Sequence, residues 1–131
     1  MSYTTAEMTA AITEFFKDQD RRRLISMLRD DFYLKVPASL PYGGTFTGPK
    51  EIDEFLARID DGPYWESFVT DLDHVIVAED HLIAPITITA RGKANGASMT
   101  VENLWLFDVR DGNFTRAHIY ADTAAAHATA G

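Results

Sequence analysis

The sequence contains no cysteine, and its 12 basic residues are outnumbered by 20 acidic ones. The lack of thiols excludes disulfides, thiolate nucleophiles and sulfur ligands for metals. A formal net charge of −8 repels phosphate backbones and anionic lipid surfaces, so we expect neither nucleic acid nor a membrane as a partner. There is no apolar run of about 18 residues and no secretory-type leader pattern. We therefore predict a cytoplasmic protein.

Motifs for metals and nucleotide cofactors are also missing. The four histidines show no paired ligand spacing. The pair Gly43-Gly44 lacks both a following helix and the lysine of a phosphate-binding loop. No set of Ser, His and Asp stands out as a nucleophilic triad. The sequence predicts no metal and no cofactor.

Helical patterns occupy the first half of the chain, and residues 1–131 fit one domain. A capping box formed by Thr4 and Glu7 begins a helix that we expect to end near Lys17. We expect a second short helix to end near Asp30, and a third to begin after Gly48-Pro49. The intervening segment 37–49, rich in proline and glycine, is predicted to be a loop.

Strand-like patterns dominate the second half. The predicted strands are residues 32–36, 65–78, 81–91, 98–109 and 114–121. Turn residues join the last four into a meander, and a short helix follows Asp122. Because the helices come first and the long strands last, we predict an α+β fold. In this fold the N-terminal helices pack in the concave face of a curved, mainly antiparallel sheet.

The last predicted hairpin suggests where a pocket lies. With an even-length turn at Asp111-Gly112, the numbers of paired residues sum to 223. A three-residue turn would instead shift the register by one. In the first register one face carries the side chains of Val101, Asn103, Trp105, Phe107, Arg116, His118, Tyr120 and Asp122. This face predicts an apolar wall with converging polar groups, and the opposite face suits packing against a second subunit.

Three residues on this face are candidates for catalysis. Asp122 is the candidate acid or base, although its position also suits the N-cap of the last helix. Tyr120 could donate to a substrate oxygen, and His118 could contact the same substrate; both also fit ordinary core or rim positions. The expected ligand-binding residues are Asn103, Trp105, Tyr42, Phe16, Phe107 and Val101.

The order of these elements resembles a SnoaL-like domain of the nuclear-transport-factor-2-like superfamily. The resemblance rests on the segment 41–49, Pro-Tyr-Gly-Gly-Thr-Phe-Thr-Gly-Pro, which leads into a helix, and on a meander that ends in Ile-Tyr-Ala-Asp at 119–122. It implies a cone-shaped fold around an apolar cavity, and a homodimer formed through the outer sheet face. Polyketide cyclases, ketosteroid isomerases and epoxide hydrolases share this fold, so the resemblance does not select one reaction.

The resemblance implies roles for individual residues. Asp122 matches the acidic residue at the end of the last strand of SnoaL-type cyclases. The epoxide hydrolases need an Arg and an Asp on the middle strand, whereas residues 85–89 read Pro-Ile-Thr-Ile-Thr. Ketosteroid isomerases carry their Asp base where Val36 stands, and a tyrosine where Phe15 or Phe16 stands. Asp122 is thus the one acid that matches.

These patterns predict a cofactor-free isomerase or cyclase that performs proton transfer on a small apolar carbonyl compound. The alternative is a non-catalytic ligand-binding or dimerisation module, and an enzyme similar to the epoxide hydrolases is a second alternative. A cavity of about 300 Å³ or more with Asp122 pointing inward would favour an enzyme or a binder. A filled interior with Asp122 bonded to the amide of Ala124 or Ala125 would favour the module.

Overall fold

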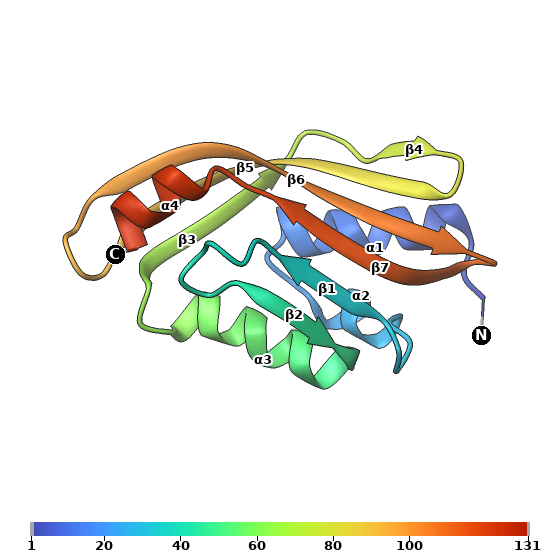
Figure 1. Ribbon diagram of the computed structural model, residues 1–131. Helices are drawn as coiled ribbons and strands as arrows, with labels where there is room; N and C mark the ends of the chain where they lie inside the picture. The colour runs from blue at the N-terminus through green and yellow to red at the C-terminus, as the bar shows by residue number, and fades with distance from the viewer. Residues whose placement is uncertain (1, 131) are drawn as a thin grey trace.

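A computed structural model describes residues 2–130 of the chain (Figure 1). Within this part there are four helices, namely α1 (Thr5–Lys17), α2 (Arg22–Ser26), α3 (Gly48–Asp61) and α4 (Thr123–Ala130). The same part contains seven strands, namely β1 (Tyr33–Val36), β2 (Gly44–Thr47), β3 (Trp65–Leu72), β4 (Ile76–Ala78), β5 (His81–Gly92), β6 (Ser98–Arg110) and β7 (Asn113–Tyr120).

All seven strands form one sheet, in the order β2-β1-β7-β6-β5-β3, and β4 pairs with the other end of β5. Every pairing is antiparallel except the one between β1 and β7, which is parallel. The sheet curves over the helices α1 and α3, which lie on its concave side (Figure 1). The prediction of an α+β fold with helices in the concave face of a curved sheet is confirmed.

Local sequence signals explain where the helices begin. The predicted capping box is present, because the amide of Glu7 donates to the hydroxyl of Thr4 and the amide of Thr4 donates to the carboxylate of Glu7. The third helix contains Pro49 in its first turn, as predicted. The second helix is shorter than expected and ends at Ser26. Asp20 still accepts the amide of Arg22 at its start.

Two strand predictions were wrong. The segment 37–49 is not all loop, because Gly44–Thr47 pairs with β1 as an edge strand. The run 65–78 is not one strand but two, β3 and β4, with a break at residues 73–75. The break lies opposite Pro85, which has no N–H to donate to a continuous ladder.

The core lies between the helices and the inner sheet face. A chain of aromatic rings runs through it, in which the Phe16 and Trp105 centroids lie 5.3 Å apart and those of Trp105 and Phe107 5.7 Å apart. Phe114 continues the chain at 5.4 Å from Phe107. Buried aromatic side chains of this kind contribute large apolar areas to stability. They tie α1 to β6 and β7.

The register of the last hairpin differs from the prediction. Next to the turn, Arg110 pairs with Asn113, which is the predicted register, because their residue numbers sum to 223. A β-bulge then leaves Thr115 without a paired residue, and its hydroxyl donates to the carbonyl of Asp108 at 3.2 Å. Beyond the bulge His118 pairs with Leu106 rather than Trp105. The side chains of β7 after this point therefore face the opposite side from the one predicted.

The turn at Asp111-Gly112 generates a first prediction. Gly112 has a φ of 72°, and a Cβ added there would lie 2.7 Å from the backbone oxygen of Tyr3. Gly96 has a similar φ of 67°, but a Cβ added there would come no closer than 3.6 Å to its nearest neighbour, the side chain of Arg91. We expect Gly96→Ala to lose about 1–2 kcal/mol of unfolding free energy from backbone strain alone. Gly112→Ala should lose clearly more in urea unfolding, and equal losses would contradict the close approach of Tyr3.

Candidate functional site

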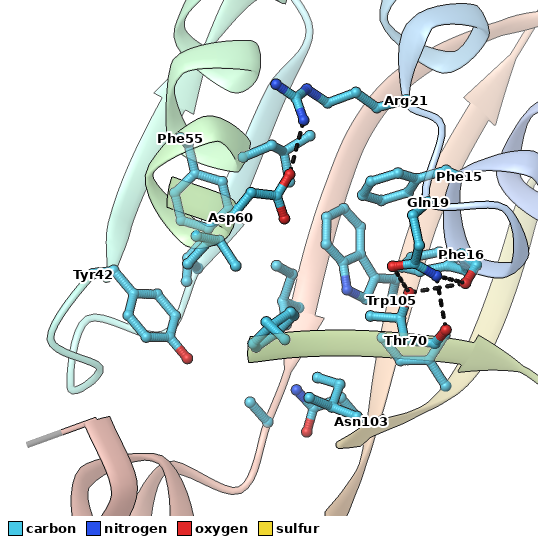
Figure 2. A pocket seen from close by; sticks show the side chains of 18 of the residues that line it. Phe15, Phe16, Gln19, Arg21, Tyr42, Phe55, Asp60, Thr70, Asn103 and Trp105 are labelled. Atoms are coloured by element: carbon cyan, nitrogen blue, oxygen red, sulfur yellow. Dashed lines mark hydrogen bonds and ion pairs between the residues drawn. The ribbon is translucent and has the colours of Figure 1, made fainter. Parts of the chain in front are cut away.

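A cavity lies between α1, α3 and the inner face of the sheet, with a volume of about 80 Å³. Its walls are mostly apolar and come from nearly every layer of the fold. Phe15 and Phe16 of α1 face it from one side, and Phe55 of α3 faces it from the other (Figure 2). Trp105 of β6 lies beside the two α1 rings in edge-on contacts at 5.7 and 5.3 Å. The cavity is thus an aromatic-walled space of the kind that takes an apolar molecule.

An ion pair lies at one end of this cavity. Arg21, the residue just before α2, donates from Nη1 to Oδ2 of Asp60 on α3 at 3.0 Å. Its Nε donates to Oδ1 of Asp53 at 2.7 Å. Asp60 and Arg21 both line the cavity. The side chain of Asp60 is 54% exposed, so this end reaches the surface.

Burial beside the cavity changes the ionisation of Asp60. Desolvation raises the pKa of its carboxyl above the usual value of 3.8, and the negative charge of Asp61 acts in the same direction. The positive charge of Arg21 opposes both effects but does not cancel them. A carboxyl whose pKa lies above its usual value is better matched to proton transfer than an ordinary surface carboxylate.

Two polar side chains occupy another part of the wall. Figure 2 shows the hydroxyl of Tyr42 and the amide of Asn103 projecting toward the cavity from different elements. The Asn103 Oδ1 atom is buried and has no hydrogen-bond partner among residues 2–130. Desolvation raises the pKa of Tyr42 to about 12, so its hydroxyl keeps its proton. A buried acceptor without a partner costs free energy, and a ligand donor would relieve that cost.

A family model of the SnoaL-like domain matches residues 9–117, which is most of the chain. The chain belongs to the SnoaL-like domain family. This confirms the family resemblance predicted from the sequence. Among functionally curated proteins no match was found.

Solved structures similar to this SnoaL-like domain share its fold over almost the whole chain. TerC co-crystallised with polyporic acid has 24% identity and a TM-score of 0.77, with 95% of each chain covered. A nuclear-transport-factor-2-like protein of unknown function from Burkholderia pseudomallei has 20% identity and a TM-score of 0.80, again with 95% of each chain covered. A putative SnoaL-like polyketide cyclase from Jannaschia sp. has 12% identity and a TM-score of 0.76, covering 99% of this chain and 96% of its own.

Four of the six expected ligand-binding residues of this SnoaL-like domain lie on the cavity wall, namely Asn103, Trp105, Tyr42 and Phe16. Phe107 is fully buried behind the indole ring of Trp105 and does not line the cavity. Val101 lies further along β6 and is also outside the wall. Binding of a ligand by the four wall residues stays a prediction.

The three candidate catalytic residues do not meet at the cavity. Because the bulge shifts β7 by one residue, His118 and Tyr120 lie on the outer sheet face, with their rings stacked at 4.2 Å. Burial, together with the positive charges of Lys35 and Arg116, lowers the pKa of His118. Asp122 follows the end of β7, and its Oδ1 accepts the amide of Ala125 at 3.0 Å. The expected convergence of these groups inside the pocket was wrong.

The sequence interpretation missed the pair formed by Arg21 and Asp60. Arg21 opens the run Arg21-Arg22-Arg23 beside Asp18 and Asp20, a pattern that is typical of a solvated helix start. A signal was available on the third helix, where Asp53 and Asp60 are seven residues apart and therefore share one face over two turns. Two carboxylates together at the edge of the apolar face of a helix are well placed to bind a cationic side chain from a neighbouring element.

Two further features of the described chain bear on its ligands. Within residues 2–130 the structure has no group of three or more His, Asp or Glu side chains placed to hold a metal ion. No helix in this part combines the length and apolar character needed to cross a membrane.

The capping bond of Asp122 gives a second prediction. Replacing Asp122 by Ala removes the acceptor for the Ala125 amide, and we expect a loss of about 0.5–2 kcal/mol of unfolding free energy. Asp122→Ser supplies another good N-cap acceptor and should retain most of that free energy in the same urea titration. Equal stability of the Ala and Ser variants would contradict a capping role.

Proposed function

We propose that this SnoaL-like domain binds a small apolar carbonyl compound in its cavity and acts on it by proton transfer, without a cofactor. The observation that supports this most directly is Asp60, a carboxyl with a raised pKa at the edge of an aromatic cavity. Isomerisation and aldol-type cyclisation are reactions of this kind, since each needs a base to remove a proton beside a carbonyl. In this proposal Asp60 takes the role that the sequence had suggested for Asp122.

The residues that line the cavity would have different roles in such a reaction. Asp60 in its ionised form removes the proton, and the neighbouring Arg21 holds the carboxylate in place. The hydroxyl of Tyr42 donates a hydrogen bond to the carbonyl oxygen, where negative charge develops as the proton leaves. The unpartnered Oδ1 of Asn103 accepts from a hydroxyl of the ligand. The aromatic rings of Trp105 and Phe15 exclude water from the apolar part of the ligand.

The size of the cavity limits the ligand and the state that binds it. Its 80 Å³ is below the roughly 150 Å³ of an apolar cavity that admits benzene. It is also below the range of about 300–1,000 Å³ for pockets that hold drug-sized ligands. Binding therefore requires the walls to open, and a ligand of one ring or less is favoured.

A non-catalytic module is the second candidate function. Two observations favour it, namely the small cavity and the bond between Asp122 and the amide of Ala125. In that case the cavity is a packing defect, and Asp60 only helps to fix α3 to the start of α2. Epoxide hydrolysis has no comparable support, because residues 85–89 of β5 carry no charge.

The third prediction separates these candidates with two matched variants. We expect Asp60→Asn to lower the rate of isomerisation of cyclohex-3-enone to cyclohex-2-enone by about 100-fold or more, the usual contribution of a general base. Asp53→Asn removes the other carboxylate that binds Arg21 but lies outside the cavity wall, and it should change the rate much less. The reaction is monitored by the ultraviolet absorbance of its conjugated product, cyclohex-2-enone.

The pH dependence supplies a further criterion for this reaction. A base is active only when ionised, so the rate should rise as the pH increases through the raised pKa of Asp60 and then level off. Turnover that survives in Asp60→Asn but is lost in Asp122→Asn would return the catalytic role to Asp122. Turnover no faster than the uncatalysed rate in the wild type and in all three variants, with no binding of small ketones, would favour the non-catalytic module.

We further propose that two copies of the chain pair through the outer sheet face. Leu104 and Leu106 of β6 and the ring of Tyr120 form an apolar strip on this face, and Tyr120 is 49% exposed. Beside the strip the carboxylate of Asp108 is already neutralised by Arg116 at 2.7 Å, and the Nδ1 atom of His81 lies within hydrogen-bond distance of it at 2.9 Å. Burying such a neutralised network against a partner costs less than burying a free charge.

The fourth prediction tests this pairing. Tyr120→Glu places an unpaired charge in the apolar strip and should convert a dimer into a monomer in analytical ultracentrifugation. Val77→Glu is the matched control, because Val77 is 57% exposed but pairs with the buried Leu82, on the inner face of the sheet. A wild-type chain that sediments as a monomer, or a Tyr120→Glu variant that stays dimeric, would contradict the proposed interface.

A further inference from the structure

A surface cleft of about 600 Å³ lies directly outside the cavity, next to α2 and the start of α3. It is lined by charged and small side chains, among them Asp20, Arg22, Lys50 and Asp53. Gln19 and Arg21 are the two residues that line both the cleft and the cavity. They therefore form the partition between an aqueous cleft and an aromatic interior.

The two residues of this partition are held very differently. Gln19 is fixed from several sides, because its Nε2 donates to the carbonyl of Phe16 at 2.7 Å and to that of Thr70 at 2.9 Å. The hydroxyl of Thr70 donates to the carbonyl of Phe16 at 2.9 Å and also lies 3.2 Å from the Gln19 Oε1 atom. Moving Gln19 would break these bonds between α1 and β3.

The Arg21 side chain is 26% exposed, and among residues 2–130 its polar contacts are the ion pairs with Asp53 and Asp60, both of which are exposed. The side chains of Asp53 and Asp60 are 53% and 54% exposed, so both carboxylates can be hydrated when the guanidinium leaves. Exposed ion pairs contribute little to stability and are weakened by salt. Arg21 is therefore the part of the partition that moves at the lowest cost.

A second groove lies on the outer side of the sheet near the end of β7, where Glu102, Leu104 and Tyr120 line it. The cavity wall is stiffer where it meets this outer groove. Ile86, Asn103 and Ala121 are shared by the cavity and that groove. Ile86 is buried and lies on β5, which is paired with β3 on one side and β6 on the other. Opening the wall at Ile86 would require breaking the strand pairing on both sides of β5, whereas opening it at Arg21 requires only a side-chain rotation.

We propose that Arg21 is the gate of the cavity. When its guanidinium leaves Asp60 and turns into the cleft, the interior and the cleft become one continuous site. The apolar part of a small uncharged molecule then enters the aromatic interior, and its polar end stays in the cleft. The open site explains how a ligand can bind although the closed cavity, at 80 Å³, is too small for it. The proposal of a gate depends on the proposed function in one respect, the chemical class of the ligand that enters the cavity.

Acrylamide quenching tests the gate without any knowledge of the natural ligand. The chain has two tryptophans, and only Trp105 lines the cavity, so the measurement uses a Trp65→Phe background. Acrylamide is small and uncharged, and it quenches Trp105 only after entering. With Arg21 present, we expect slow quenching that accelerates as sodium chloride screens the ion pairs. With Arg21→Ala, quenching should be faster by roughly 5- to 30-fold and independent of salt.

The matched control is Arg22→Ala in the same background. Arg22 lines the cleft and binds Asp20, but it is absent from the cavity wall, so its removal should leave the quenching of Trp105 unchanged. Equal quenching with and without Arg21, or equal acceleration by both alanine substitutions, overturns the gate. Loss of ketone turnover in Asp60→Asn does not bear on this result, because acrylamide reports opening alone.

A second measurement covers the case in which Trp65→Phe does not fold. In a chain that keeps both tryptophans and carries 5-fluorotryptophan, each residue gives its own ¹⁹F resonance. The uncharged nitroxide TEMPOL should broaden the Trp105 resonance more in Arg21→Ala than in the wild type. The resonance of Trp65, which is 1% exposed, serves as the internal reference. Equal broadening of the Trp105 resonance in the two proteins overturns the gate.

Discussion

The β-bulge at Thr115 determines which side chains of the last strand reach the cavity. A one-residue shift in a strand exchanges its two faces, because neighbouring side chains point to opposite sides. The bulge turns Ile119 inward, beside Trp105, and leaves His118 and Tyr120 outside. The interior consequently receives apolar side chains from β7, and the outer face receives polar and aromatic ones. Both the aromatic cavity and the proposed dimer surface depend on this shift.

The apolar interior then gives the cavity its chemistry. The aromatic wall removes part of the water around the half-exposed carboxylate of Asp60, so its pKa rises even though Arg21 is 3.0 Å away. The same desolvation keeps Tyr42 protonated as a donor. Arg21 has two roles in this proposal. It holds Asp60 in position, and it closes the cavity toward the cleft. The access of a ligand and the ionisation of the proposed base are therefore coupled through one side chain.

The sequence predicted the architecture well because the signals for it are local. Capping at Thr4, the helix start at Pro49 and alternation in the long strands all act within a few residues. The edge strand Gly44–Thr47 was missed because surrounding glycines and prolines hide its short alternation, and it exists only by pairing with β1. The break at residues 73–75 likewise depends on Pro85, which is distant in sequence. Pairing across the sheet determines these features, and local propensity does not contain it.

The site was predicted only in part, for a similar reason. The wall residues of β6 were identified because alternation along one strand places Asn103 and Trp105 together. The partners from β7 required the position of a bulge, which no residue type in the turn at Asp111-Gly112 reveals. Arg21 and Asp60 come from different helices and meet only after packing, although the spacing of Asp53 and Asp60 indicated a shared face.

The proposed function depends on Asp60, at the rim of the aromatic cavity, being the functional carboxyl of this SnoaL-like domain. The most direct test is a carboxylate NMR titration of Asp60 in the wild-type chain, repeated with a saturating small ketone. We expect a pKa above the usual 3.8 without the ketone and a higher value with it, because the ketone removes the remaining water. A pKa at or below 3.8 that the ketone does not change would contradict the claim.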